Sequence, residues 1–240
     1  MTELTLLNRI KDLHKVCRLL SMLKSQLIER LPHYGHDALF LKNDEITTGL
    51  LNNITELKIH LLTGQFLYFH DEEGHFIDLI NDDISEQVKY IVTKYGLDMP
   101  QIPDLRNLST KDLSYYLAFA TKANRCLGLF RMKLAGHFTQ VHLWPEGFDF
   151  SVEWFTGKKD EQIGIGISPG DNDYKAPYLY VNPNPFVEKV AGEVLPVGIW
   201  HTTRWKGIKV EWKELEKKED FEISTQIHNL FLIALRNFRP

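Results

Sequence analysis

Cysteine is scarce in this chain, which has only Cys17 and Cys126 among its 240 residues. Two cysteines are too few for a disulfide framework, and no C-x-x-C pair is present to indicate a metal or redox motif. Both cysteines lie among apolar neighbours in segments with helical spacing. We therefore interpret them as buried free thiols, which pack like small apolar side chains.

Long apolar runs and an excess of positive charge are also missing. No apolar run approaches the roughly 20 residues that cross a bilayer as a helix, and charged residues interrupt the first segment. The formal net charge is -4, so no global basic field draws the chain to nucleic acid. We therefore expect a cytoplasmic protein that binds neither a membrane nor a nucleic acid.

Catalytic and cofactor motifs are absent as well. In the segment GIGISPGD at 164–171 the glycine spacing is not G-x-G-x-x-G, and Pro169 and Asp171 stand where a helix would begin. No G-x-S-x-G elbow and no H-E-x-x-H pair occurs. A metal site from His137, His142, His201 and Asp149 would need tertiary convergence. We expect no cofactor and no metal ion.

The segments that are present predict a mixture of helices and short strands. Apolar residues recur at helical spacing over 3–31, 84–95, 109–135 and 220–237. Strand-like runs lie between them, at 38–41, 57–62, 65–69, 75–79, 139–144, 148–156, 161–168, 177–182, 199–203 and 207–213. Hairpin-type turns outnumber helical crossovers, which favours antiparallel pairing. We predict an α+β fold, mostly antiparallel sheet flanked by long helices.

The order of helix, strands and helix occurs twice along the chain. Residues 97–108 contain two prolines and no periodicity, which is typical of a linker. We therefore predict a single domain over 1–240 with two lobes, 1–96 and 109–240, joined by that linker. The lobes would be related in architecture, although no residue-level repeat connects them.

The second half of the chain predicts a sheet with one apolar and one polar face, because successive strand residues point to opposite sides. Apolar residues alternate with polar residues, glycines or tyrosines in four strand segments. The residues expected on the polar face are His142, Trp144, Asp149, Ser151, Glu153, Gly164, Gly166, Tyr178 and Tyr180. Alternate glycines weaken a strand, so something large should lie over Gly164 and Gly166. Either an aromatic such as Trp144 or Trp200, or a bound ligand, would fill that role.

This face is the best candidate for a site, and three functions remain open. A small-molecule-binding protein would use Trp144 and Tyr178 as apolar walls and His142 and Asp149 to orient a polar group. A hydrolase would use His142 as its base and Asp149 to orient it, although Ser151 in a regular strand lacks the exposed turn of a typical nucleophile. An interaction module would instead expose an apolar patch. The oligomeric state stays open.

The segment HLWPEGFDFSVEWFTG, followed by SPGDNDYKAPYLYVNPNP, resembles a bacterial family described as domain of unknown function 5996. The resemblance is most specific over about 137–186. It is carried by His142, Trp144, Pro145, Phe148, Asp149, Pro169, Gly170, Pro177, Tyr178 and Tyr180. Some members of that family place a second histidine before the Phe-Asp pair, where this chain has Gly147. The resemblance implies a shared fold and site, and it implies no reaction.

Overall fold

The computed structural model describes residues 5–71, 73–105 and 108–238, and it confirms the α+β fold class. The chain divides into two compact units, each built on an antiparallel sheet. Unit 1 comprises residues 1–121 and 143–148, and unit 2 comprises residues 122–142 and 149–240. The segment 97–108, of which 106 and 107 lie outside the described residues, falls within unit 1. Its role as a linker between two lobes of one domain stays a prediction.

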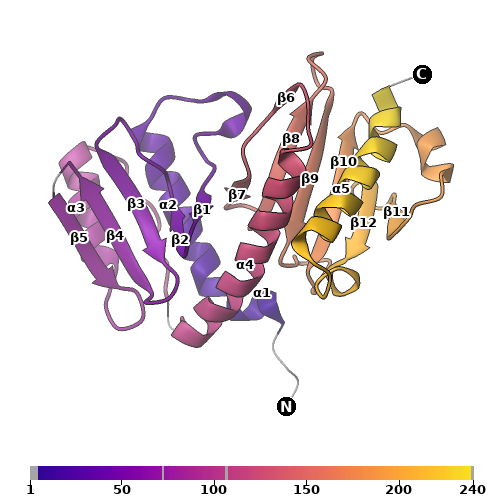
Figure 1. Cartoon of the computed structure of the whole chain (residues 1–240). Helices are drawn as coiled ribbons and strands as arrows, with labels where there is room; N and C mark the ends of the chain where they lie inside the picture. The colour runs from indigo at the N-terminus through magenta and orange to yellow at the C-terminus, as the bar shows by residue number, and fades with distance from the viewer. Residues whose placement is uncertain (1–4, 72, 106–107, 239–240) are drawn as a thin grey trace. The chain divides into compact units, whose positions relative to one another are not determined.

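The sheet of unit 1 has five strands in the order in which they occur along the chain, each antiparallel to the next. Strand β5 is therefore an edge strand, as Figure 1 shows. The strands are β1 (Phe40–Lys42), β2 (Glu45–Thr47), β3 (Thr55–His60), β4 (Gln65–His70) and β5 (Glu73–Asp78). The prediction missed β2, which is short and carries little alternation.

The helix predicted over 3–31 consists of two helices, α1 (Leu6–Arg9) and α2 (Lys11–Leu27). Residues 3 and 4 lie outside the described part of the chain. The predicted end was wrong because Ile28 is already extended, several residues before the proline. The apolar stripe of α2 is buried, which argues against this helix as a docking surface; its buried apolar residues are Leu13, Val16, Cys17, Leu19, Leu20 and Leu23.

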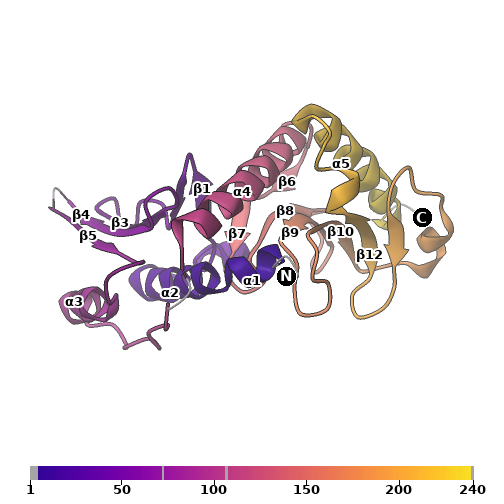
Figure 2. The same cartoon turned by 90° about the horizontal axis from the view of Figure 1, so that it is seen from below.

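Helix α3 (Ser85–Tyr95) follows the sheet of unit 1 and ends as predicted at Gly96, which adopts the left-handed conformation with φ of 62°. This conformation is unfavourable for most side chains and is the usual role of glycine after a helix. Figure 2 shows α2 and α3 on the same side of the five-stranded sheet. The other side of the sheet carries the half-buried residues of β3 and β4, which alternate with buried ones.

The segment 143–148 of unit 1 is held by aromatic stacking. The Phe148 ring lies between His14, at 4.7 Å between ring centroids, and Tyr116, at 4.9 Å. The His14 Nε2 atom is 2.6 Å from the Pro145 carbonyl oxygen. Phe148 has a φ of 58°, so the surrounding packing holds a conformation that a phenylalanine rarely adopts. Part of the sequence segment HLWPEGFD therefore has a packing role in unit 1.

The sheet of unit 2 has the strand order β11-β12-β10-β9-β8-β6. Its neighbouring strands are all antiparallel. The strands are β6 (His137–Phe138), β8 (Asp149–Phe155), β9 (Gln162–Ser168), β10 (Tyr178–Asn184), β11 (Ile199–His201) and β12 (Gly207–Glu211). Strand β7 (His142–Trp144) and helix α4 (Thr110–Arg131) both contain a boundary between the units.

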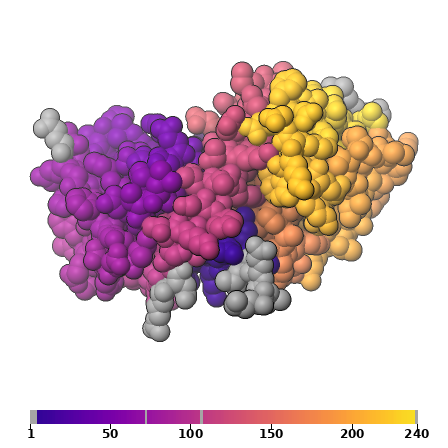
Figure 3. Space-filling view, turned by 60° about the horizontal axis from the view of Figure 1, so that its bottom comes forward, coloured from indigo at the N-terminus to yellow at the C-terminus, as the bar shows by residue number. Residues whose placement is uncertain are grey.

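Helix α5 (Asp220–Ala234) covers one face of the unit 2 sheet (Figure 2). The predicted apolar rows form the core of this unit, and they are fully buried: Phe150, Val152, Ile163, Ile165, Ile167, Leu179 and Val181. Phe130 from the second half of α4 meets Phe231 of α5 edge to face, at 5.7 Å between ring centroids. The outer side of α5 reaches the surface, where its yellow atoms appear in Figure 3. No described helix combines the length and apolar character required to cross a membrane.

Candidate functional site

The polar face of the unit 2 sheet lies on the side opposite the apolar rows. We use this name for the side chains or backbone of Asp149, Ser151, Glu153, Gly164, Gly166, Tyr178, Tyr180 and Lys209. The strand register brings them together, since Ser151 pairs with Gly166, Gly166 pairs with Tyr180, and Tyr180 pairs with Lys209. The seven predicted residues of strands β8, β9 and β10 therefore share one surface, and Lys209 of β12 extends it.

Asp149 and Tyr180 form the closest contact on the polar face. The Tyr180 hydroxyl donates a hydrogen bond to Asp149 Oδ2 over 2.5 Å, although the two residues lie on strands that are separated by β9. The Tyr180 ring reaches across because Gly166 has no side chain. A β-carbon built at Gly166 would lie 2.3 Å from both Cζ and the hydroxyl oxygen of Tyr180. The glycine is therefore required for this hydrogen bond.

Glu153 and Gly164 repeat this arrangement one row along the strands. The Ser151 hydroxyl donates to Glu153 Oε1 over 3.1 Å. A β-carbon at Gly164 would lie 3.0 Å from Glu153 Oε2, so the carboxyl group lies against the bare backbone. Both glycines of β9 thus make room for a polar side chain of a neighbouring strand.

The side chains over the glycines differ from those expected from the sequence. The aromatic ring over Gly166 belongs to Tyr180, and the group over Gly164 is the Glu153 carboxyl. Trp200 instead packs edge to face on Phe186, and its indole N–H donates to the Glu193 carbonyl. The expectation of a tryptophan was wrong because alternation assigns faces but does not say how far a side chain reaches across neighbouring strands.

The two carboxyl groups of the polar face are half-buried. Burial raises the pKa of Asp149 to about 6 and the pKa of Glu153 to about 7. The negative charge of Asp171 adds to the shift at Asp149, and that of Asp149 adds to the shift at Glu153. Within the described residues neither carboxyl forms an ion pair, and the nearby Lys209 ammonium pairs with Glu211. Both groups therefore titrate close to neutral pH.

Trp205 contacts both the tyrosines of the polar face and the His201 ring. Its ring stacks on His201, at 4.1 Å between ring centroids, and lies 6.3 Å from the rings of both Tyr178 and Tyr180. The Lys209 ammonium lies over the ring of Tyr174 at 4.5 Å, a distance typical of a cation–π contact. Half-buried Trp205 thus provides an apolar wall beside Tyr180, whose hydroxyl contacts Asp149.

Hydrogen bonds hold these aromatic side chains in place. The Tyr178 hydroxyl donates to Asp171 Oδ2 over 2.6 Å, and burial raises the pKa of Tyr178 above its usual range. The same aspartate accepts the backbone N–H groups of Asp173 and Tyr174, each at 2.7 Å. His201 lies between the Tyr174 hydroxyl, 2.5 Å from Nε2, and the Trp205 carbonyl, 2.6 Å from Nδ1. The turn at Asp171 therefore fixes the tyrosines as well as reversing the chain.

Two further predicted site residues, His142 and Trp144, lie on strand β7, outside the strands that build the polar face. His142 is buried, with 8% of its surface exposed, and belongs to unit 2, where a catalytic pairing with Asp149 stays a prediction. Trp144 belongs to unit 1 and is therefore outside the site built here from unit 2. In the described ranges no three His, Cys, Asp or Glu side chains are arranged so that they could hold a metal ion.

The sequence analysis missed Lys209, Trp205, His201 and Tyr174 as members of this surface. Lys209 could have been found, because it lies between Ile208 and Val210 in a strand and alternation places it on the polar side. Trp205 and Tyr174 lie outside the regular strands, so no periodic signal marks them. Comparisons with protein-family models, with curated proteins and with solved structures found no match. The resemblance to domain of unknown function 5996 stays a prediction.

Proposed function

We propose that the chain binds a small molecule on the polar face of unit 2. The observation that carries this proposal is the pair of half-buried carboxyls, Asp149 and Glu153, each hydrogen-bonded to one side-chain hydroxyl and to no cation among the described residues. A desolvated carboxylate without a charged partner is costly, so a protein that keeps two of them on one surface benefits from an external partner.

The ligand class follows from these groups. An ionised carboxylate has about four acceptor positions on its two oxygens. Among the described residues Asp149 accepts from the Tyr180 hydroxyl and from its own backbone N–H, and Glu153 accepts from the Ser151 hydroxyl, so acceptor capacity remains. The Tyr180 ring, next to the Asp149 carboxyl, and the neighbouring Trp205 ring present aromatic faces, which attract cations. The best complement is a small organic amine or guanidine with an apolar part that packs on Trp205. Such a mixture of an apolar wall and a few polar groups is usual for small-molecule sites.

A thermal-shift screen of organic amines and guanidines, with matched uncharged alcohols, tests this proposal. We expect hits among the cations, with shifts in Tm that are lost in Asp149→Asn and in Glu153→Gln. Each substitution keeps the shape of the side chain and removes its charge.

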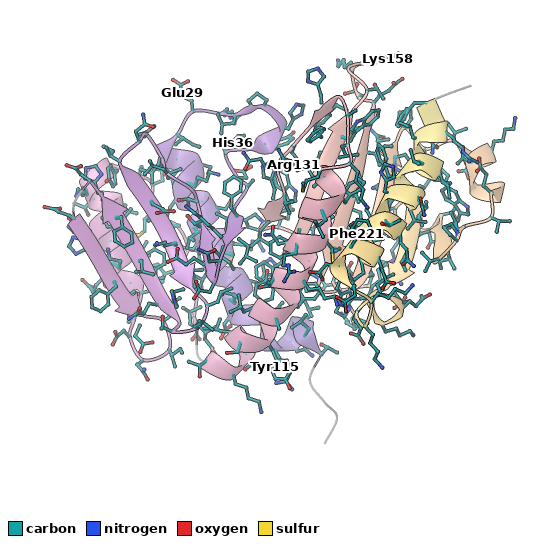
Figure 4. The ribbon with its side chains drawn as sticks, viewed as in Figure 1. Glu29, His36, Tyr115, Arg131, Lys158 and Phe221 are labelled. Carbon is teal, nitrogen blue, oxygen red and sulfur yellow. The ribbon has the colours of Figure 1, made fainter. Side chains whose placement is uncertain are left out.

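The matched control is Asp160→Asn. Asp160 is exposed on the turn between β8 and β9, two residues after Lys158. Figure 4 labels Lys158 at one end of the sheet. The Asp160 φ of 62° is one that asparagine tolerates, so the fold should be unaffected. Cationic hits that shift the wild type, Asp149→Asn and Glu153→Gln equally would contradict the proposed site.

A second candidate function is general acid–base catalysis on the same face. The pKa values of about 6 for Asp149 and about 7 for Glu153 favour it, because a group that titrates near the working pH both gives and accepts protons well. The hydrolase reaction with His142 as base belongs to this class. A panel of chromogenic ester, amide and glycoside substrates tests it. Turnover that depends on Asp149 or Glu153 would support an enzyme, and turnover unchanged in both variants would assign the activity elsewhere.

A further inference from the structure

Within the described part of the chain, the outer edge of the unit 1 sheet, at strand β5, leaves backbone hydrogen-bonding groups without a strand partner. The Leu79 N–H donates to the Gly64 carbonyl, and hydrogen-bonded and non-hydrogen-bonded pairs alternate along an antiparallel ladder. With the register of β4 and β5, the backbone groups of Gly74, Phe76 and Asp78 therefore point away from β4. The Asp78 N–H is taken by Asp82 Oδ2 at 3.3 Å, which agrees with this direction.

The side chains along this edge are unusually exposed for a strand. Phe76 has 71% of its surface exposed, and it lies beside half-buried Leu67 on the face of the sheet opposite α3. On the other face His75 contacts the rings of Tyr68 and Tyr90. The edge thus offers two residues with free backbone groups, Gly74 and Phe76, and one uncovered aromatic side chain.

Negative charge surrounds the same edge. Among the described residues, the acidic ones on β5 and on the turns that flank it are Asp71, Glu73, Asp78, Asp82 and Asp83. Lys94 lies 3.7 Å from Glu73 and compensates part of this charge. Hydrogen bonds from Asn81 and Ile80 lower the pKa of Asp78, and those from Ser85 lower the pKa of Asp83, so both stay ionised at neutral pH.

We propose that the β5 edge binds an extended, positively charged segment of a partner protein, which adds a strand to the unit 1 sheet. Free backbone groups at an exposed edge are the usual basis for strand addition, and pockets or charges beside the edge select the incoming sequence. The partner segment would alternate apolar residues, which pack on Phe76, with lysine or arginine that pairs with the flanking carboxylates. A second copy of this chain is disfavoured, because two such acidic edges repel each other.

The test uses the full chain and a short synthetic peptide that alternates lysine with valine, with a glutamate–valine peptide as control. Binding is followed by backbone amide resonances in NMR spectra. We expect the basic peptide to shift the Gly74 and Phe76 amides and to slow their exchange with solvent, with an affinity that falls as salt is added. The acidic peptide should leave these amides unchanged.

Two substitutions at one position separate the backbone contribution from the apolar one. Phe76→Pro removes the outward N–H, which an edge strand tolerates, and should weaken the basic peptide about tenfold. Phe76→Leu keeps the N–H and an apolar side chain, and should bind within about threefold of the wild type. An unchanged spectrum at β5 with the basic peptide, or equal binding of both peptides, overturns the proposal. The carboxylates would then serve to keep the edge from self-association.

Discussion

The two units keep ionisable side chains out of water in opposite ways. Unit 1 buries a cation, Lys24, which is 3% exposed and donates to the Gly35 carbonyl over 3.0 Å and to the Ala38 carbonyl over 2.5 Å. Burial lowers the pKa of Lys24 to about 8. Unit 2 instead holds two acids, Asp149 and Glu153, whose pKa values burial raises to about 6 and about 7.

The difference lies in how completely each group is satisfied. The Lys24 ammonium donates to two backbone carbonyls and lies 5.1 Å from the centre of the Phe40 ring, so unit 1 satisfies its buried group internally. The carboxyls of unit 2 retain acceptor capacity beyond the hydroxyl that each contacts and the backbone N–H that Asp149 also accepts. A buried ionisable group whose hydrogen bonds are all made within the chain indicates a structural role. Carboxyl oxygens that can still accept hydrogen bonds on a half-buried surface indicate a binding partner. The comparison therefore locates the candidate site in unit 2.

The largest expected effect on stability comes from adding a side-chain carbon at Gly166 of β9. In Gly166→Ala the new β-carbon would lie within 2.3 Å of the Tyr180 ring, so the ring must move and its hydrogen bond to Asp149 is lost. We expect a loss of about 1–3 kcal/mol in the free energy of unfolding, as for overpacking in other cores. Urea denaturation measures it. Wild-type stability in this variant would show that Tyr180 is not held against Gly166.

Asp149 and Glu153 of unit 2 should make the free energy of unfolding depend on pH. Their pKa values are higher in the folded state than in the unfolded chain, so the folded state binds more protons between about pH 4 and pH 7. The stabilisation from the two protonated carboxyls is complete below the pKa values of the unfolded chain. It is lost as the pH rises through their folded-state pKa values of about 6 and about 7. We expect the double variant Asp149→Asn, Glu153→Gln to lose this slope and to exceed the wild type at pH 8 by about 1–2 kcal/mol. Parallel pH curves for the two proteins would refute it.

Unit 1 should show the opposite slope at higher pH. The pKa of Lys24 is lower in the folded state than in the unfolded chain, so the unfolded chain binds more protons between about pH 8 and pH 10.5. Stability from this residue therefore rises with pH over that interval. Lys24→Met should remove the rise, which denaturation at a series of pH values will detect. The same rise in Lys24→Met as in the wild type would show that another group causes it.

The smallest expected effect is a gain in stability from Gly128→Ala, which serves as the control for Gly166→Ala. Gly128 lies within α4, and apart from its chain neighbours and the adjacent backbone of the helix, no described atom would lie within 4 Å of a β-carbon there. We expect Gly128→Ala to raise the free energy of unfolding by about 0.5–1 kcal/mol, because alanine has the higher helix propensity. The two glycine variants should thus differ in sign. A destabilised Gly128→Ala protein would mean that the effect at Gly166 cannot be assigned to Tyr180 alone.

Alternation in β8, β9 and β10 was sufficient to predict most of the candidate surface. Asp149, Ser151, Glu153, Tyr178 and Tyr180 lie on one face because adjacent strand residues point to opposite sides. The reach of Tyr180 over Gly166 was not predictable, because it depends on which strands are neighbours and on side-chain length. Trp205 and Tyr174 were missed since irregular segments have no period. The break between α1 and α2 was missed because the apolar spacing continues through it.

The sequence by itself determined the class of fold, the apolar core faces and the group of polar residues that share the reverse face, because the periodicities of helix and strand are local properties. Only the tertiary structure decided which polar groups meet: the hydroxyl of Tyr180 with Asp149, Ser151 with Glu153, and Tyr178 with Asp171. Strand order and register bring these residues together from distant parts of the chain. The raised pKa values of the two carboxyls follow from the burial that this assembly imposes.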